Sequence, residues 1–215
     1  KAGTHRLLHA CAGALDPWFP AACVVCGATG AATLCAPCET ALPGRNAPRC
    51  TGCGERVPAS AAPCAACAAN PPPFERTHVL ADYAPPLDRV VHALKFGREA
   101  ALARPLGEAL ARDLGRHPAP PDARWLVTAI PLSLERLAAR GFNQSLEIAR
   151  ALARAQRLPL DHRLLVRTRA GAPASTLPAR ARREALEGAL AAPVPLADRA
   201  VLVVDARGQV LGKLG

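Results

Sequence analysis

The stretch that decides the fold of the first third of this chain lies between Cys23 and Cys67. It holds four Cys-x-x-Cys pairs, which read C-V-V-C at 23–26, C-A-P-C at 35–38, C-T-G-C at 50–53 and C-A-A-C at 64–67. Two thiolates three residues apart on a tight turn can bind one metal ion, and Gly27 and Gly54 follow two of the pairs, where a positive φ suits the turn. Two pairs complete a tetrahedral zinc site. The spacing therefore predicts a double zinc ribbon with two structural zinc ions.

The way in which the pairs combine is open at this point. We favour sequential pairing, with one site formed by Cys23, Cys26, Cys35 and Cys38 and the other by Cys50, Cys53, Cys64 and Cys67, and interleaved pairing is the alternative. Disulfides would need an oxidising compartment, and nothing in the sequence argues for export. A thioredoxin-like redox pair should begin a helix in a strand-rich unit, whereas these loops are rich in Pro and Ala. Four thiolates fill every position of a zinc site, so neither site is expected to be catalytic.

Charge and composition restrict the kinds of protein and ligand that this sequence can represent. The chain has 215 residues, half of them apolar, and a formal net charge of +10 carried mostly by arginine. No apolar run approaches the roughly 18–20 residues of a spanning helix, and the apolar patch near the N-terminus does not resemble a cleavable signal, so we expect a cytoplasmic protein. Arginine suits bidentate contacts with phosphate, so the charge permits a phosphorylated ligand or a nucleic acid.

The ribbon itself is a poor candidate for binding DNA. Its basic residues Arg45, Arg49 and Arg56 face two acidic ones, Glu39 and Glu55. Each zinc ion held by four thiolates adds a further net negative charge, so the metallated segment lacks the basic patch that non-specific DNA binding requires. We expect a structural or protein-docking module.

The rest of the chain has a different pattern. A stiff Asn-Pro-Pro-Pro linker at 70–73 precedes a region in which strand and helix patterns alternate. We predict strands at 79–83, 125–130, 164–166 and 199–204, and helices at 87–96, 99–114, 133–139, 142–156 and 178–186. Such alternation favours an α/β fold with a mostly parallel sheet flanked by helices, and a ligand at the carboxyl ends of the strands, in the loops after Ile130 and Val204.

These features divide the chain into five segments. We expect an N-terminal helix or arm at 1–19, the double zinc ribbon at 20–70, a linker at 71–75, the α/β domain at 76–205 and an atypical tail at 206–215.

Three motifs together resemble the ComF-type competence proteins. They are the paired cysteines, the run A-I-P-L-S-L-E-R-L-A-A-R-G-F-N-Q-S at 129–145 and the strand V-L-V-V-D at 201–205; H-A-L-K-F at 92–96 is also similar to the family. The resemblance covers residues 20–205. It implies a double zinc ribbon joined to a type I phosphoribosyltransferase fold, binding of phosphoribosyl pyrophosphate with Mg2+, and a link to DNA uptake and natural competence.

The resemblance also assigns candidate residues for that ligand. Asp205 matches the first acid of the family's ribose-binding Asp-Asp pair, and Arg140 and Lys95 are plausible partners of the pyrophosphate. Asn143 and Gln144 could add neutral hydrogen bonds. The simpler alternatives are that Arg140 ends a helix, Lys95 covers apolar surface with its stem, Asn143 caps a helix and Asp205 ends a strand.

The C-terminal tail departs from the family pattern. The second acid of the pair is replaced by Ala206, and the Thr-rich phosphate loop that should follow is missing from 206–215, as expected for a truncated or frame-shifted gene product. Whether the protein is a glycosyltransferase therefore stays open. The alternative is a non-catalytic accessory protein that acts through DNA-uptake proteins or single-stranded DNA.

Overall fold

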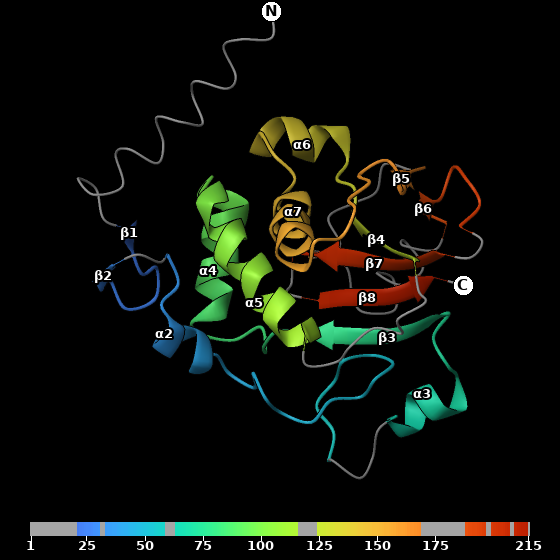
Figure 1. Cartoon of the computed structure of the whole chain (residues 1–215), viewed down its shortest axis with the longest axis horizontal. Coiled ribbons are helices and arrows are strands. Elements are labelled where there is room, and N and C mark those ends of the chain that lie inside the picture. Colours follow the sequence, from blue (N-terminus) through green and yellow to red (C-terminus); the bar gives the residue numbers. More distant parts are fainter. Residues whose placement is uncertain are drawn as a thin grey trace, which may run out of the picture.

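The computed structural model describes residues 21–30, 33–58, 63–115, 124–168, 188–196, 199–206 and 209–214. Its ribbon elements are β1 (Ala21–Ala22), β2 (Thr29–Gly30), α2 (Ala36–Thr40) and α3 (Ala65–Ala69). The elements that follow are β3 (Phe74–Val79), α4 (Leu87–Phe96), the 3-10 turn η1 (Ala100–Leu102), α5 (Ala103–Gly115), β4 (Arg124–Ala129), α6 (Leu134–Arg140), α7 (Gln144–Gln156), β5 (Val166–Arg167), β6 (Leu190–Ala191), β7 (Arg199–Asp205) and β8 (Gln209–Leu214). Figure 1 shows the ribbon elements wrapped around one side of a helix-and-sheet body.

The central sheet has the strand order β3-β8-β7-β4. Of the three neighbouring pairs, β4 with β7 is parallel, whereas β8 runs antiparallel to both β7 and β3. Strands β3, β7 and β4 therefore share one direction, as a mostly parallel sheet would require, but β8 lies between β3 and β7 in the opposite direction and makes the described sheet a mixed one. The reason is the tail: three residues separate Asp205 from Gln209, and so short a connection can only return the chain antiparallel, as a hairpin.

Alternate residues of the parallel strands face opposite sides of the sheet. Val127 and Val204 are fully buried in the main core, which also holds buried residues of α4, α5 and α7. Leu126 and Val203 point the other way and pack with Leu165 in a second, smaller cluster. Both faces are thus covered, which explains why these two strands are nearly continuous apolar runs.

Most predicted elements occur near their predicted positions. The helix at 87–96 has the predicted bounds, with its buried side chains at helical spacing, and Pro105 is accommodated in the first turn of α5. The strand predicted at 79–83 is wrong, because the strand there is Phe74–Val79, which pairs with β8. The helix predicted at 178–186 lies outside the described residues. Among the described helices, none combines the length and apolar character needed to cross a membrane.

Two groups of ion pairs fasten the ribbon to the body. Buried Arg45 bonds Glu39 at 2.8 Å, Asp113 of α5 at 3.2 Å and the carbonyl of Leu80 at 3.3 Å. Glu39 also pairs with Arg112 of α5. The ribbon is therefore attached to the body by these side-chain contacts with α5 and Leu80, in addition to the covalent linker.

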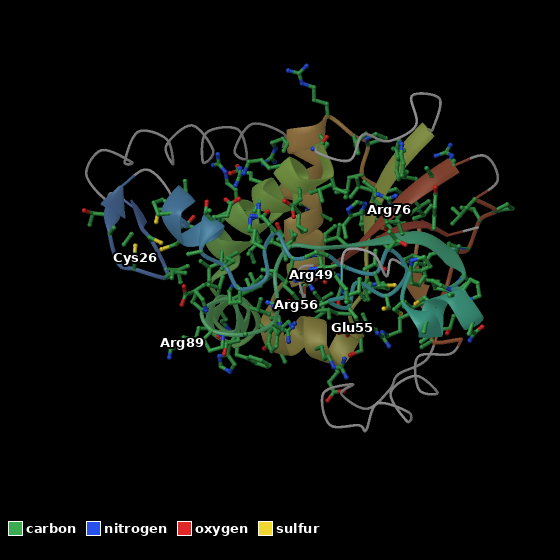
Figure 2. The ribbon with its side chains drawn as sticks, turned by 90° about the horizontal axis from the view of Figure 1, so that it is seen from below. Cys26, Arg49, Glu55, Arg56, Arg76 and Arg89 are labelled. Atoms are coloured by element: carbon green, nitrogen blue, oxygen red, sulfur yellow. The ribbon has the colours of Figure 1, made fainter. Side chains whose placement is uncertain are left out.

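The second group centres on Asp82, just after β3. Its carboxylate accepts from Arg49 at 2.6 Å and from Arg56, and its backbone N–H donates to the carbonyl of Pro43 at 2.7 Å. Figure 2 shows Arg49 and Arg56 close together beneath the body. All three arginines of the ribbon thus take part in docking, which agrees with its expected structural role.

Candidate functional site

The first cluster of sulfur atoms lies between β2 and α2. Cys23 and Cys26 lie on the turn after β1, Cys35 caps the start of α2, and Cys38 lies within it. Their four Sγ atoms lie within 4.8 Å of one another, with Cys26 and Cys35 3.8 Å apart. Gly27 has φ +72°, and its N–H donates to the carbonyl of Cys23 at 2.7 Å, which closes the turn.

The second cluster repeats this geometry. Cys50 and Cys53 lie on a turn, Cys64 caps the start of α3 and Cys67 lies within it, and the four Sγ atoms again lie within 4.8 Å. Cys53 and Cys64 are 3.8 Å apart, and Gly54 closes the turn at φ +75°. Figure 1 shows α2 and α3, which carry Cys38 and Cys67, at opposite sides of the molecule. The structure therefore brings the cysteines together in sequential groups rather than interleaved ones.

The sulfur geometry fits zinc. Four sulfurs at about 2.3 Å from a central ion form a tetrahedron with edges of about 3.8 Å, which is the separation of the Sγ atoms of Cys26 and Cys35 and of those of Cys53 and Cys64. Backbone N–H groups also point at sulfur: Cys35 donates to Cys23 at 3.4 Å, and Cys64 to Cys50 at 3.3 Å. Two structural zinc ions, each held by one of these groups, are what the donor sets fit.

The ionisation of the thiols also supports zinc binding. Burial opposes ionisation of Cys23, but backbone N–H groups of Cys35, Cys26 and Val25 lower its pKa to about 6. The N–H groups of Cys64 and Cys53 likewise lower the pKa of Cys50 to about 6.

The last thiol of each group shows the opposite effect. Hydrogen bonding with Cys35, followed by burial, raises the pKa of Cys38 to about 12, and burial, followed by the neighbouring thiols, raises that of Cys67 to about 12. Four thiolates so close together need a cation to balance them, and a zinc ion would supply that charge in each group.

A second candidate site lies where β4 and β7 end. The N–H of Ile130 donates to the carbonyl of Val204 at 3.1 Å, and the side-chain amide of Asn143 donates to the carbonyl of Ile130 at 3.1 Å. The N–H of Ala206 donates to the Oγ of Ser145 at 3.0 Å. These bonds join the two strand ends to the first turn of α7, which brings Asn143, Gln144 and the end of β7 at Asp205 to one edge of the sheet.

The candidate residues from the sequence have different roles at this edge. Asn143 is the N-cap of α7, and its side-chain oxygen accepts from the N–H groups of Ser145 and Leu146. Gln144 is buried, and its side-chain oxygen accepts from Arg140. Arg140 is also stacked over the ring of Phe96, 5.5 Å from the ring centroid. Arg140 thus contacts α4 at Phe96, the neighbour of the candidate Lys95.

Sequence reasoning missed two arginines of this edge, Arg136 and Arg167. Burial and then the charge of Arg136 lower the pKa of Arg140, and the same two causes lower that of Arg167. Arg136 therefore lies near both guanidinium groups. Arg167 donates to the carbonyl of Pro131 at 3.4 Å. The four-residue spacing of Arg136 and Arg140, which puts both on one face of α6, could have indicated Arg136 from the sequence. Arg167 could not be predicted in this way, because it lies in β5, far along the chain.

The edge fits magnesium less well than phosphate. A protein site for Mg2+ is usually built from one or two carboxylates and the phosphates of the substrate. Here Asp205 is followed by Ala206, whose side chain is buried and whose N–H is already bonded to Ser145. Of the family's pair of acids, this chain thus keeps only Asp205. A magnesium ion at this edge would therefore be bound mainly by phosphate oxygens of the ligand.

Comparisons with known proteins agree with the ribbon and extend beyond it. Residues 14–73 match the family of double zinc ribbon domains. The chain is 35% identical over 158 residues to the DNA utilization protein YhgH of Escherichia coli O157:H7, a match that covers 73% of this chain and 70% of that protein. It is 31% identical over 174 residues to the DNA utilization protein YhgH of Salmonella typhimurium, covering 80% and 76%. No solved structure matches the chain.

The similarity to these relatives covers much more than the ribbon, since it is more than twice as long as the ribbon match. On these grounds the chain belongs to the ComF-like family, which includes the DNA utilization protein YhgH.

Proposed function

We propose that this protein serves DNA uptake or utilization and binds a ribose pyrophosphate ligand, phosphoribosyl pyrophosphate, at the edge where β4 and β7 end. The observation that supports this choice of ligand is the cluster of Arg136, Arg140 and Arg167. The role in DNA uptake rests on relatives named as DNA utilization proteins, which share sequence with both the ribbon and the body.

The arginine cluster has the electrostatics of an anion site. Burial, followed by the charge of Arg136, lowers the pKa of both Arg140 and Arg167, so like charges repel one another in a partly desolvated place. The contacts of the latter two are with neutral groups: the amide oxygen of Gln144, the ring of Phe96 and the carbonyl of Pro131. A pyrophosphate would relieve this repulsion through charge-assisted, bidentate hydrogen bonds.

The remaining candidates complete the proposed ligand contacts. Asp205 at the end of β7 would accept from the ribose hydroxyls, and Mg2+ would enter with the pyrophosphate oxygens as its main ligands. The side-chain oxygen of Gln144 orients Arg140, so Gln144 acts as a positioning residue. Lys95 would add positive charge from the C-terminal turn of α4.

A non-catalytic role is the second candidate. Transfer of the phosphoribosyl group requires dipoles aimed at the charges that develop in the transition state. In this chain Ala206 replaces an acid, its N–H is bonded to Ser145, and β8 follows where the phosphate loop was expected. These observations favour an accessory protein in which the ligand is bound but not consumed.

Calorimetric titration tests the ligand proposal. We expect phosphoribosyl pyrophosphate with Mg2+ to bind the full, zinc-loaded chain, and Arg136→Gln or Arg167→Gln to weaken binding by roughly 10-fold to 100-fold, the loss typical of a hydrogen bond to a charged group. Arg150→Gln is the matched control, because Arg150 is an exposed arginine of α7 that pairs with Glu147. Absence of heat at millimolar ligand, or an equal loss in the control, would overturn the proposal.

A further inference from the structure

We infer that the outer face of α4 is a base-stacking site for single-stranded DNA, formed by Tyr83, His92 and Phe96 and bordered by arginines. This inference rests on the DNA part of the proposed function. It shares Arg140 with the proposed pyrophosphate site, but its rings are tested separately from that ligand. It starts from aromatic side chains that the core does not use.

Aromatic residues are scarce in this chain, at 3% of its residues, yet two of them are placed in solvent. Tyr83 is 59% exposed and Phe96 is 66% exposed, and they are the aromatic members of the exposed large apolar residues in the described ranges. Both line the same groove of about 560 Å³, and His92 and Arg89 also line it. That volume lies in the usual range for ligand sites.

The rings are arranged as a platform. His92 and Phe96 lie one helical turn apart on α4, and their ring centroids are 4.8 Å apart with the planes tilted by 44°. The guanidinium group of Arg140 lies on the Phe96 ring, 5.5 Å from its centroid, and leaves most of the ring exposed. Stacking of this kind accepts any base, because every base presents a π face.

The charge around the platform matches a phosphate backbone. Arg98 donates to the carbonyl of Ala139 at 3.4 Å, which ties the end of α4 to α6 and its arginines. Asp88 also lines the groove, but basic residues of the wider edge outnumber acidic ones: Arg89, Lys95, Arg98, Arg136, Arg140 and Arg167 against Asp88, Glu99, Glu135 and Asp205. Figure 2 shows Arg89 on the outside of α4, away from the sheet.

The charge around the rings favours nucleic acid over a protein with an apolar docking surface. Basic residues outnumber acidic ones there, and one of them, Arg140, lies on the Phe96 ring, where it can add a cation–π contribution beside a stacked base. The ribbon cannot replace this surface, because Arg45, Arg49 and Arg56 are bonded to carboxylates. A single strand would place its bases on Tyr83 and Phe96 and its phosphates toward Arg140.

Fluorescence anisotropy with labelled oligothymidylate of about 16 nucleotides, which spans a typical binding site, tests the inference on the zinc-loaded full chain. We expect the Tyr83→Ala/Phe96→Ala double variant to lose roughly 10-fold to 100-fold in affinity, and Tyr83→Phe/Phe96→Tyr, which keeps both rings, to stay within about 3-fold of the unmodified chain. An abasic strand of equal length should bind all three proteins weakly and equally. Zinc content and circular dichroism confirm that each variant is folded.

Three results would overturn the inference. If the alanine variant binds oligothymidylate as tightly as the unmodified chain, the stacking site is wrong while the link to DNA remains. If no strand binds at low salt, the site is wrong, and the separate titration with phosphoribosyl pyrophosphate still decides the ligand proposal. If sedimentation shows a dimer that only the alanine variant loses, the rings belong to a contact between copies of this chain.

Discussion

Asp82 is a single carboxylate shared by two arginines of the ribbon. Arg49 is mostly buried and Arg56 is half exposed, so the bond with Arg49 is the better shielded from water. Arg49 also donates to the carbonyls of Gly44 and Gly54, which places it at the centre of the second half of the ribbon. Loss of the carboxylate would leave this arginine without its charged partner while it remains buried.

We therefore predict that Asp82→Asn lowers the free energy of unfolding by about 1–2 kcal/mol at neutral pH, less than a fully buried pair because of partial exposure. Glu108→Gln, which breaks an exposed pair with Arg104 on α5, is the control and should cost about 0.5 kcal/mol or less. Urea unfolding measures both. An Asp82 effect no larger than that of the control would contradict the prediction.

The pH dependence of Asp82→Asn follows from its environment. The hydrogen bond from Arg56, then that from Arg49, holds the pKa of Asp82 below its ordinary value of 3.8, against the effect of burial. A lowered pKa in the folded state means that the pair stabilises fully above about pH 4 and loses its effect as the pH falls through the lowered pKa. The stability difference between the two proteins should therefore shrink below pH 4 and stay constant above pH 5. A stability difference that does not change with pH would contradict the assignment of this effect to the ionised Asp82 carboxylate.

At the scale of elements, the contact between α5 and α7 depends on a glycine. A Cβ atom on Gly107 would lie 2.5 Å from the carbonyl oxygen of Ile148 and 2.6 Å from the Cβ of Ala151. The first of these atoms belongs to the backbone of α7, so it cannot move unless the helix moves. The sequence signalled two amphipathic helices, but it did not show that a glycine inside one of them sets how closely they approach.

Gly107→Ala is predicted to destabilise the chain by roughly 1–3 kcal/mol through overpacking, despite the better helix propensity of alanine. Gly115→Ala is the matched control at the end of the same helix, where the nearest atom to a new Cβ is the side-chain nitrogen of Gln156 at 3.8 Å. Thermal unfolding compares the two. A melting temperature for Gly107→Ala equal to or above that of the control would show that the helices can separate without cost.

At the scale of the whole molecule, the metal sites and the body form one structure. The N–H of Thr77 in β3 donates to the carbonyl of Thr51 at 2.7 Å, between two cysteines of the second group. Leu42 of the ribbon belongs to the same core cluster as α4 and α5. A change in the ribbon should therefore reach the sheet and the helices.

Chelation of zinc is predicted to release two ions per chain and to lower the melting temperature of the entire chain. The expected reason is that zinc ligation supplies most of the folding free energy of a segment with few large apolar residues, on the order of 10–16 kcal/mol per site in small peptides. Cys53→Ser should reduce the zinc content to one ion per chain, whereas Cys11→Ser, outside the four pairs, should leave two. Metal analysis and calorimetry check these outcomes. An unchanged body transition after chelation would show that ribbon and body are energetically independent.

The sequence by itself determined the features that depend on spacing along the chain. The Cys-x-x-Cys pairs predicted two four-sulfur sites with a glycine closing a turn in each, and the helical period of Leu87, Val90, Val91 and Leu94 predicted α4, because both patterns are local. The structure then decided that the pairs combine sequentially. Only the tertiary structure decided that Asp82 joins Arg49, that Arg167 meets Arg136, and that β8 enters the sheet beside β3. Each of these brings together segments far apart in the chain, and such contacts depend on how layers pack rather than on the order of residues.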